Sequence, residues 1–210
     1  MESYHKIQTV FKRDPETNYK TLLMGDYSLP EFEYLKDCEW IFTEKVDGMN
    51  IRVMWDGAKV RFGGKSDNAQ IPAQLSERLY DLFQDADRVK SVLAEGPVCI
   101  YGEGYGAGIQ KAGVMYGPSK DFILFDVKYG DMWLQRKDVE DIAMKLDLAV
   151  VPEIGRGTLH DMVFQIQQGI TLSVVANCLS IAEGIVARPA TELRTRRGDR
   201  MITKLKVKDF

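Results

Sequence analysis

The sequence predicts an α+β fold in one domain of 210 residues, built of antiparallel sheets with flanking helices. Runs rich in aromatic and β-branched residues follow one another in hairpin order, and helical patterns lie between them. This order favours antiparallel sheets over a parallel doubly wound sheet. With 45% hydrophobic and 28% charged residues, the chain can bury a core of its own.

The first half of the chain predicts three strands and a helix. Residues 39–45 (EWIFTEK) and 49–55 (MNIRVMW) have strand composition, and an Asp-Gly turn at 56–57 continues the second strand into a hairpin. Residues 71–86 predict an amphipathic helix after a proline, because apolar side chains recur there at helical spacing. Residues 97–106 (PVCIYGEGYG) predict a strand that runs into a glycine-rich loop.

The second half predicts a hairpin, two helices and two more strands. Residues 122–135 alternate as a β-hairpin that turns at Gly130-Asp131. Residues 136–148 and 158–169 predict short surface helices, the second ending at Gly169. The last strands are expected within 179–189 (LSIAEGIVARP) and 199–210 (DRMITKLKVKDF).

The composition predicts a soluble protein from a reducing compartment. The three cysteines are far apart and in no metal-ligand spacing, and two histidines are too few for a His-rich metal site. No apolar run approaches the roughly 20 residues that cross a bilayer, and the N-terminus lacks the apolar core of a signal peptide. We therefore expect a cytoplasmic protein that does not bind a membrane.

The C-terminal segment departs from the net charge of −3. Residues 188–210 hold eight basic and three acidic side chains, which makes this segment locally +5. A face that binds a polyanion would explain the excess, and so would a solvated strand edge protected by lysines.

Several short motifs carry reactive or charged side chains, and each also has an ordinary structural interpretation. Lys45 stands two residues before Asp47-Gly48, a common turn dipeptide. Residues 101–108 (YGEGYGAG) could wrap a phosphate with backbone N–H groups or simply make tight turns. Each motif alone leaves both interpretations open.

Further motifs lie towards the C-terminus. Phe122 and Phe125 are three apart in a strand and cannot both face the same side, so one of them can face a pocket. Glu183 and Arg188 bracket an apolar strand. The alternation in 204–208 (KLKVK) puts three lysines on one face, where they repel one another unless an anion lies there.

Taken in order, these motifs closely resemble motifs I, III, IIIa, IV and V of the covalent nucleotidyltransferases. The matching segments are Lys-Val-Asp-Gly, Tyr-Gly-Glu-Gly, Phe-x-x-Phe-Asp-Val, Glu-Gly-Ile-Val-x-Arg and Lys-Leu-Lys, and they extend from about Trp40 to the C-terminus. That superfamily comprises ATP-dependent DNA ligases, RNA ligases and mRNA capping enzymes. Asn50, the segment GAGIQKAG after Glu103 and the closing KLKVKDF look most like the RNA ligase 2 type. The resemblance implies a ligase adenylation domain, ATP-grasp-like in architecture.

The resemblance also implies an activity, that of an ATP-dependent RNA ligase that uses Mg²⁺ or Mn²⁺. Lys45 would attack the α-phosphate of ATP, displace pyrophosphate and carry AMP as a phosphoramidate. AMP would then pass to an RNA 5′-phosphate, and an RNA 3′-hydroxyl would displace it. An ordinary lysine, with a pKa of about 10.4, is protonated at neutral pH, so nearby cations must favour the free amine. Lys204 and Lys206 would supply these cations and hold the phosphates.

Other residues receive roles from the same resemblance. Glu44, Glu103 and Phe122 would contact ATP, with Phe122 stacked on adenine and Phe125 left to the core. Glu183 and Glu103 would bind the metal ion. Asp47-Gly48 would turn the backbone sharply behind the nucleophile. Contacts with RNA or its phosphates would come from Asn50, Lys65 and Arg188.

The sequence departs from the family pattern at three points. Lys65 stands where relatives carry an arginine, which keeps the charge but loses the bidentate fork. Arg188 stands where many ligases have lysine. The sequence ends at motif V, before the OB or helical domain that relatives carry. We therefore expect a stand-alone, monomeric catalytic core. An unknown protein partner could take the place of the missing domain. Its opening segment looks like phage and bacterial members.

Other functions remain open at this stage. Within the superfamily, the alternatives are a minimal ATP-dependent DNA ligase and a GTP-using guanylyltransferase. From another class, the chain could be a non-catalytic module that binds RNA ends or nucleotides. The leading interpretation has RNA 5′-phosphate and 3′-hydroxyl ends as its partners.

Overall fold

The computed structural model describes residues 3–210, which fold into two compact units. Unit 1 comprises residues 3–5, Asp47–Val151 and Ala176–Cys178. Unit 2 comprises Lys6–Val46, Pro152–Val175 and Leu179–Phe210. The sequence predicts one domain without an interior boundary, whereas the structure has two units, each with its own sheet and apolar core. Because the chain passes repeatedly from one unit to the other, no composition change marks the division.

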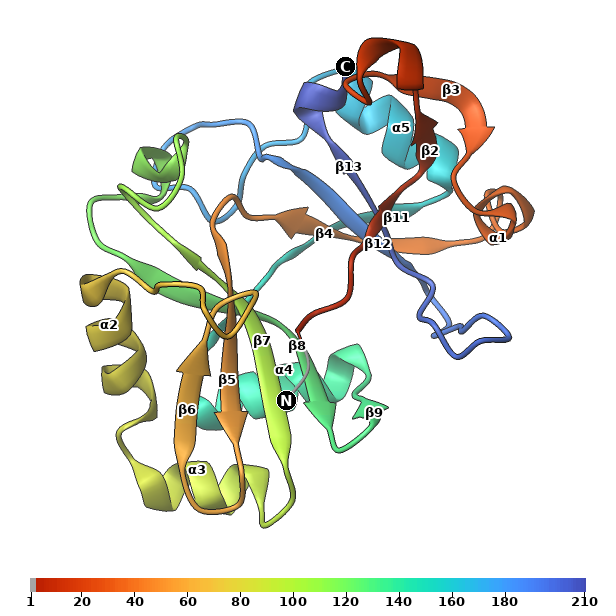
Figure 1. Cartoon of the computed structure of the whole chain (residues 1–210). Helices are drawn as coiled ribbons and strands as arrows, with labels where there is room; N and C mark the ends of the chain where they lie inside the picture. The colour runs from red at the N-terminus through yellow and green to blue at the C-terminus, as the bar shows by residue number, and fades with distance from the viewer. Residues whose placement is uncertain (1–2) are drawn as a thin grey trace. The chain divides into compact units, whose positions relative to one another are not determined.

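Unit 1 is a six-stranded sheet (Figure 1). Its central order is β10-β8-β7-β5-β6, and β9 pairs with β8. All neighbours are antiparallel except β10, which runs parallel to β8. The strands are β5 (Met49–Trp55), β6 (Val60–Gly63), β7 (Val98–Tyr105), β8 (Asp121–Tyr129), β9 (Met132–Trp133) and β10 (Ala149–Val150).

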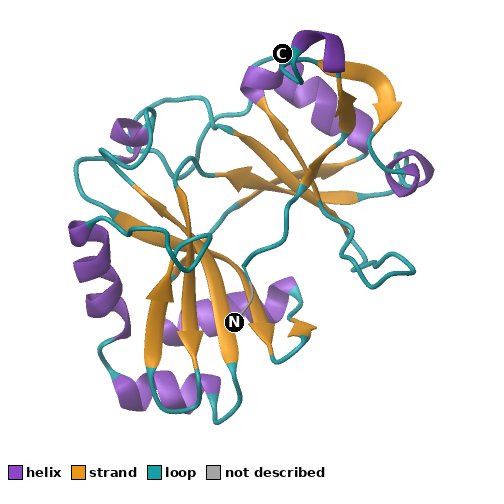
Figure 2. Ribbon diagram, in the orientation of Figure 1, coloured by secondary structure: helices purple, strands orange, loops and turns teal. Residues whose placement is uncertain are grey.

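Three helices complete unit 1 (Figure 2). They are α2 (Ala73–Phe83), α3 (Ala86–Leu93) and α4 (Arg136–Leu146). The apolar stripe of α2, with Leu75, Leu79 and Phe83, packs into one cluster with side chains of β5, β7 and β8. Helix α4 buries Val139 and Ala143 in the same cluster. The predicted surface helix therefore has one buried face and one face exposed to solvent.

Unit 2 is a five-stranded sheet in the order β1-β13-β12-β4-β11. Its strands are β1 (Gln8–Thr9), β4 (Trp40–Lys45), β11 (Glu153–Gly157), β12 (Gly184–Pro189) and β13 (Thr203–Lys206). The pair β1 and β13 is parallel, and the other neighbours are antiparallel. A hairpin of β2 (Phe11–Arg13) and β3 (Leu22–Tyr27) and a short helix α1 (Pro30–Tyr34) complete the N-terminal part.

Helix α5 (Leu159–Gln167) packs against the sheet of unit 2 (Figure 1). Its first turn is fixed by a capping box between Thr158 and Asp161. Leu159, Met162 and Ile166 of the helix are buried together with the inward-facing residues of β4, β12 and β13. One face of these strands therefore belongs to the core of unit 2.

The α+β class and the antiparallel sheets are confirmed. The predicted strands, the hairpin turns and three predicted helices all form, and α5 ends two residues before Gly169, whose φ is +62°. The sequence prediction missed α1, α3, β10, β11 and the strands before β4. Within residues 3–210, no helix is both long and apolar enough to cross a membrane.

Candidate active site

Side chains of β4 point alternately to the two faces of the sheet, and this places Lys45 on the face away from the core of unit 2. Trp40 and Phe42 are buried on the face that packs with α5, and Glu44 follows them on that face. Lys45 comes next and therefore points to the opposite face. The end of β4 thus presents an amine on a sheet face that α5 does not cover.

A row across three strands places Lys206 beside Lys45. In the β-ladder, Lys45 pairs with Gly184 of β12, and Gly184 pairs in turn with Lys206 of β13. A Cβ atom on Gly184 would lie 2.1 Å from the carbonyl oxygen of Leu205, so only glycine fits there. The two lysines therefore flank a position that carries no side chain.

Glu183 connects these two lysines. Lys45 Nζ donates to Glu183 Oε2 at 2.6 Å, and Lys206 Nζ donates to Glu183 Oε1 at 2.5 Å. Burial raises the pKa of Glu183, but the charges and hydrogen bonds of Lys45 and Lys206 together outweigh it, so the pKa lies below the ordinary value. The carboxylate is therefore ionised at neutral pH, and its charge is shared by two ammonium groups.

Two more predicted cations lie on the same sheet face. Lys204 is two residues before Lys206 and pairs with Val186, which pairs with Thr43 of β4. Arg188 follows Val186 by two residues and pairs with Ile41. Because side chains two apart in a strand share a face, Lys204 and Arg188 extend the charged row that Lys45 and Lys206 begin.

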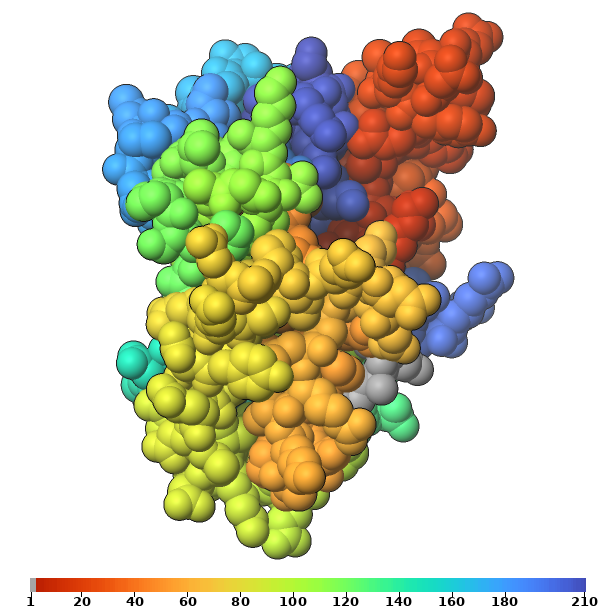
Figure 3. Space-filling model, turned by 60° about the vertical axis from the view of Figure 1, so that its left-hand side comes forward, coloured from red at the N-terminus to blue at the C-terminus, as the bar shows by residue number. Residues whose placement is uncertain are grey.

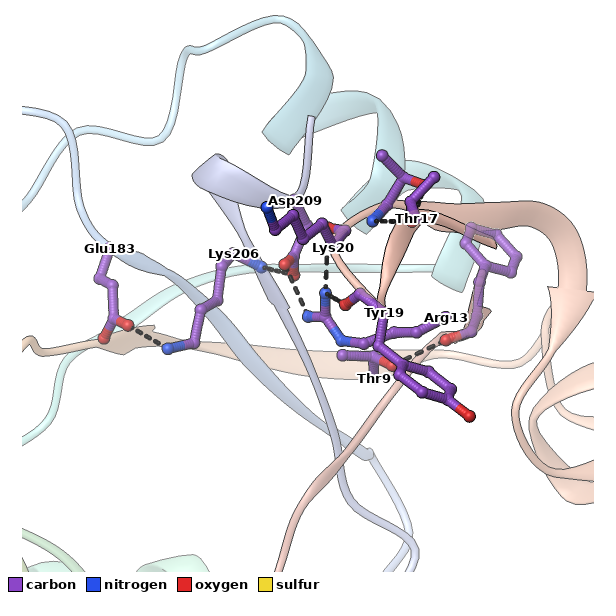
Figure 4. A network of polar contacts seen from close by, with 10 residues as sticks. Thr9, Arg13, Thr17, Tyr19, Lys20, Glu183, Lys206 and Asp209 are labelled. Carbon is purple, nitrogen blue, oxygen red and sulfur yellow. Dashed lines mark hydrogen bonds and ion pairs between the residues drawn. The ribbon is translucent and has the colours of Figure 1, made fainter. Parts of the chain in front are cut away.

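Asp209 fixes the backbone next to this row. Its Oδ2 accepts from the backbone N–H of Lys206 at 3.0 Å, and its Oδ1 accepts from Arg13 Nη2 at 2.6 Å (Figure 4). The Asp209 side chain is only 2% exposed. Sequence reasoning missed both Asp209 and Arg13, although the aspartate is part of the closing KLKVKDF segment that drew attention to the lysines.

The second half of the Lys-Val-Asp-Gly motif belongs to unit 1. The backbone N–H of Asp47 donates to the Tyr116 hydroxyl at 2.9 Å, and Gln110 donates to the carbonyl of Gly48 at 3.0 Å. A Cβ atom on Gly48 would lie 2.2 Å from the carbonyl oxygen of Gly104. Gly48 does not have a positive φ, so the close approach of β7, and not the predicted sharp turn, requires this glycine.

Unit 1 places Asn50 and Glu103 side by side. The two residues are direct partners in the β5–β7 ladder and so point to the same face of the sheet. Asn50 Oδ1 is buried and has no hydrogen-bond partner among the described residues. Lys65 lies in the exposed loop after β6 and is not part of this pair. The predicted site residues are therefore divided, with Asn50, Lys65, Glu103 and Phe122 in unit 1 and the others in unit 2.

The family is shown by a sequence comparison. The protein-family model described as RNA ligase matches residues 38–206, which include every predicted site residue. The chain belongs to the RNA ligase family. A search of curated proteins returned no match.

Solved structures of another RNA ligase share the fold. A Naegleria gruberi RNA ligase variant with AMP and Mn superposes with a TM-score of 0.65 at 14% identity, over 98% of this chain and 58% of that chain. A second variant, with ATP and Mn, gives 0.65 at 15% identity, over 98% and 56%. The same ligase with pyrophosphate gives 0.63 at 16% identity, over 98% and 58%. Our chain thus spans somewhat more than half the length of these ligases.

Glu44 has protein partners in the structure of this RNA ligase family member, and the ATP contact expected of it stays a prediction. Its carboxylate is buried and accepts hydrogen bonds from the Ser173 hydroxyl and from the backbone N–H groups of Val174 and Val175. These bonds hold the loop after α5 against β4. A contact between this carboxylate and ATP would have to displace them.

The structure places the two phenylalanines differently from their expected roles, and the adenine contact of Phe122 stays a prediction. Phe122 pairs with Gly104, one position along from Glu103, and therefore faces the other side of the sheet. Its ring is 1% exposed and packs on Phe83 of α2, with a distance of 6.4 Å between ring centroids. Phe122 has no face open to adenine and is a core residue. Phe125, expected in the core, is only half-buried and meets Tyr4 edge to face.

The carboxylates allow a limited metal site. Among residues 3–210, no group of three or more His, Cys, Asp or Glu side chains is placed to hold a metal ion. Glu183 offers two carboxylate oxygens on the sheet face that carries Lys45, and each accepts a hydrogen bond from a lysine. One carboxylate fits Mg²⁺ where phosphate oxygens and water complete the coordination shell.

Proposed function

We propose that the protein is an ATP-dependent RNA ligase that joins 3′-hydroxyl and 5′-phosphate RNA ends through a lysyl-AMP on Lys45. The observation that carries this proposal is the pair of hydrogen bonds by which Lys45 and Lys206 share the Glu183 carboxylate, on a sheet face that also bears Lys204 and Arg188. Membership of the RNA ligase family supports it, as do the structures of the Naegleria ligase with ATP, AMP and Mn.

The first step would use the Lys45 amine as nucleophile. Lys45 Nζ donates to Glu183 Oε2 at 2.6 Å, which orients the amine, and attack requires the uncharged form of the amine. Because the pKa of Glu183 is lowered, this carboxylate is a weak base, so the proton would pass to water. The free amine would then form a bond to the α-phosphorus of ATP while the bond to pyrophosphate breaks, and AMP would remain on Nζ.

The neighbouring cations would stabilise the charge that develops on the phosphate oxygens. Lys206 Nζ contacts Glu183 Oε1 at 2.5 Å. Lys204 lies two residues before Lys206 in β13, on the same face of the sheet. Fixed positive charges next to the reacting phosphorus lower the barrier of phosphoryl transfer. A Mg²⁺ or Mn²⁺ ion at Glu183 would supply further positive charge to the phosphates.

The other predicted contacts stay part of the proposal. We expect Glu103 to bind ATP or metal, and Asn50, Lys65 and Arg188 to contact RNA. The buried, unpaired Oδ1 of Asn50 is consistent with a hydrogen bond to substrate, because buried polar atoms are rarely left without a partner. The monomeric state and a separate protein partner stay predictions.

A ligation panel tests the substrate assignment. Single-stranded RNA, nicked duplex RNA and nicked duplex DNA, each with a 5′-phosphate and a 3′-hydroxyl, are incubated with the protein, ATP and Mg²⁺. We expect sealing to require ribose at the 3′-hydroxyl end, because the 2′-hydroxyl distinguishes RNA from DNA. Equal sealing of the all-DNA nick would contradict the RNA assignment. Replacement of ATP by GTP separates a guanylyltransferase, and binding without sealing would indicate a non-catalytic module.

A further inference from the structure

A basic groove lies within unit 2, between the N-terminal segment and β13. Its volume is about 900 Å³, which is in the range of sites for whole small molecules and exceeds that of a single phosphate. Six lysines and Arg13 line it. The lysines are Lys6, Lys12, Lys20, Lys204, Lys206 and Lys208. The space-filling view shows the N-terminal segment in red beside the C-terminal segment in dark blue (Figure 3).

Much of the positive charge in this groove is not neutralised. Lys12 forms an ion pair with Asp26, and Arg13 pairs with Asp209. Within residues 3–210, Lys6, Lys20 and Lys208 form no ion pair. Like charges held close together destabilise a fold unless an anion lies between them. In a protein of net charge −3, this concentration of lysines indicates a polyanionic ligand.

The groove also exposes an aromatic ring. Tyr19 lines it and is 62% exposed. Its φ of +61° lies in the left-handed region, which is strained for a bulky residue. Tyr19 N donates to the Asp14 carbonyl at 2.9 Å. Arg13 Nη1 donates to the Tyr19 carbonyl at 3.3 Å (Figure 4), and the two hydrogen bonds hold Tyr19 in this conformation. Strain that the fold maintains in this way is typical of a ligand contact.

We propose that this groove binds single-stranded RNA, with Lys6, Lys20 and Lys208 on the phosphates and Tyr19 stacked on an unpaired base. Lysines along a groove combined with an aromatic platform are the usual arrangement of single-strand binding sites. A duplex hides the faces of its bases, and so would not use Tyr19. The groove includes Lys206, whose amine contacts Glu183, so a bound strand would lead to the proposed site of chemistry. This inference rests on the proposed function in taking RNA as the substrate.

The test compares matched variants in RNA binding. A 3′-fluorescein-labelled, 5′-phosphorylated 12-nucleotide RNA is titrated with wild type, with the triple variant Lys6→Gln, Lys20→Gln, Lys208→Gln, and with a control triple variant Lys59→Gln, Lys90→Gln, Lys137→Gln. The control removes the same charge from exposed lysines of unit 1. Fluorescence anisotropy is measured at several salt concentrations, and circular dichroism verifies that each variant is folded.

We expect the groove variant to bind the RNA at least about tenfold more weakly than wild type at low salt. The magnitude of the slope of log K against log salt should fall by up to about 2, because each phosphate contact in a single strand contributes roughly 0.7. The control variant is expected to bind like wild type. Equal binding by both triple variants would overturn the proposal, and so would wild-type protein that binds duplex RNA at least as tightly as the single strand.

Tyr19 is tested separately. We expect Tyr19→Ala to weaken binding about tenfold and Tyr19→Phe to retain it, because a stacked base is worth roughly 1–3 kcal/mol. Unchanged binding in Tyr19→Ala would overturn the stacking role. Lysyl-AMP formation by the wild type is measured on the same preparation, so that its absence would contradict the proposed function while the RNA titration still decides the role of the groove.

Discussion

Lys45 Nζ lies 2.6 Å from Glu183 Oε2, although the two residues are 138 positions apart in the chain. The contact forms because β4 and β12 are neighbours, with Lys45 opposite Gly184. The amine and the carboxylate are 20% and 13% exposed, so solvent screens their interaction only in part.

Replacement of Glu183 by glutamine is expected to weaken both catalysis and folding. The amide cannot neutralise Lys45 and Lys206, so two partly buried ammonium groups lose their counter-ion. We expect lysyl-AMP formation to slow by about 10²-fold or more and the free energy of unfolding to fall by about 1–3 kcal/mol. Quenched-flow adenylylation and urea denaturation measure the two effects. The exposed Glu77→Gln variant is the control, and equal behaviour of both variants would contradict this role.

The same carboxylate should make stability depend on pH in the acid range. Its burial raises the pKa, but the two lysines lower it more, so the pKa of Glu183 is below the ordinary 4.5. A depressed pKa stabilises the fold above the unfolded value and loses this contribution as the pH falls through the folded value. The difference in unfolding free energy between wild type and Glu183→Gln should therefore be constant above about pH 6 and shrink below 4.5. A difference that grows on acidification would contradict the assignment.

Gly184→Ala is expected to disturb the lysine row. The added Cβ would lie 2.1 Å from the Leu205 carbonyl oxygen, so β12 and β13 would have to separate. We expect a loss of about 1–3 kcal/mol in unfolding free energy, with a matching loss of adenylylation. Gly155→Ala in β11 is a suitable control, because its Cβ would lie 3.5 Å from the Phe42 ring, an ordinary contact. Equal stabilities of the two variants would show that the strands tolerate the methyl group.

Phe122→Ala distinguishes a core role of this ring from the expected contact with adenine. As a core residue that contacts Phe83, Phe122 should contribute to stability, and its truncation should cost about 3–5 kcal/mol. Phe164→Ala, on the exposed side of α5, should cost little. Thermal denaturation followed by circular dichroism provides the comparison. Unchanged stability of Phe122→Ala together with a raised KM for ATP would restore the base-stacking role.

The sequence predicted the strands that carry the site because their composition and alternation are local properties. The run from Trp40 to Lys45 predicted β4, and the alternation in 204–208 correctly put Lys204 and Lys206 on one face of β13. The alternation does not extend to Lys208 as predicted, because β13 ends at Lys206 and Val207–Asp209 form a 3-10 helix. The partnership of Lys45 with Glu183 depends on β12 lying between β4 and β13, a strand order that only the family resemblance could suggest before the structure.

The failures have physical reasons. The sequence pattern placed Phe122 and Phe125 on opposite faces of a strand, but it could not say which face of the sheet α2 covers. A β-bulge next to Gly102 also shifts the register between β7 and β8. Glu44 precedes the nucleophile, yet its buried carboxylate holds a loop about 130 residues away in sequence. The basic groove joins the two ends of unit 2. Lys204, Lys206 and Lys208 belong to the KLKVK motif, whereas Lys6, Lys12 and Lys20 are spread over the N-terminal segment and form no motif.

Intact-mass spectrometry after incubation with ATP and Mg²⁺ tests the central claim most directly. We predict that the wild-type protein gains the mass of one AMP, that peptide mapping places the AMP on Lys45, and that Lys45→Ala gains nothing. An adduct of undiminished yield in Lys45→Ala, or no adduct on the wild-type protein, would contradict the assignment of Lys45 as the nucleophile.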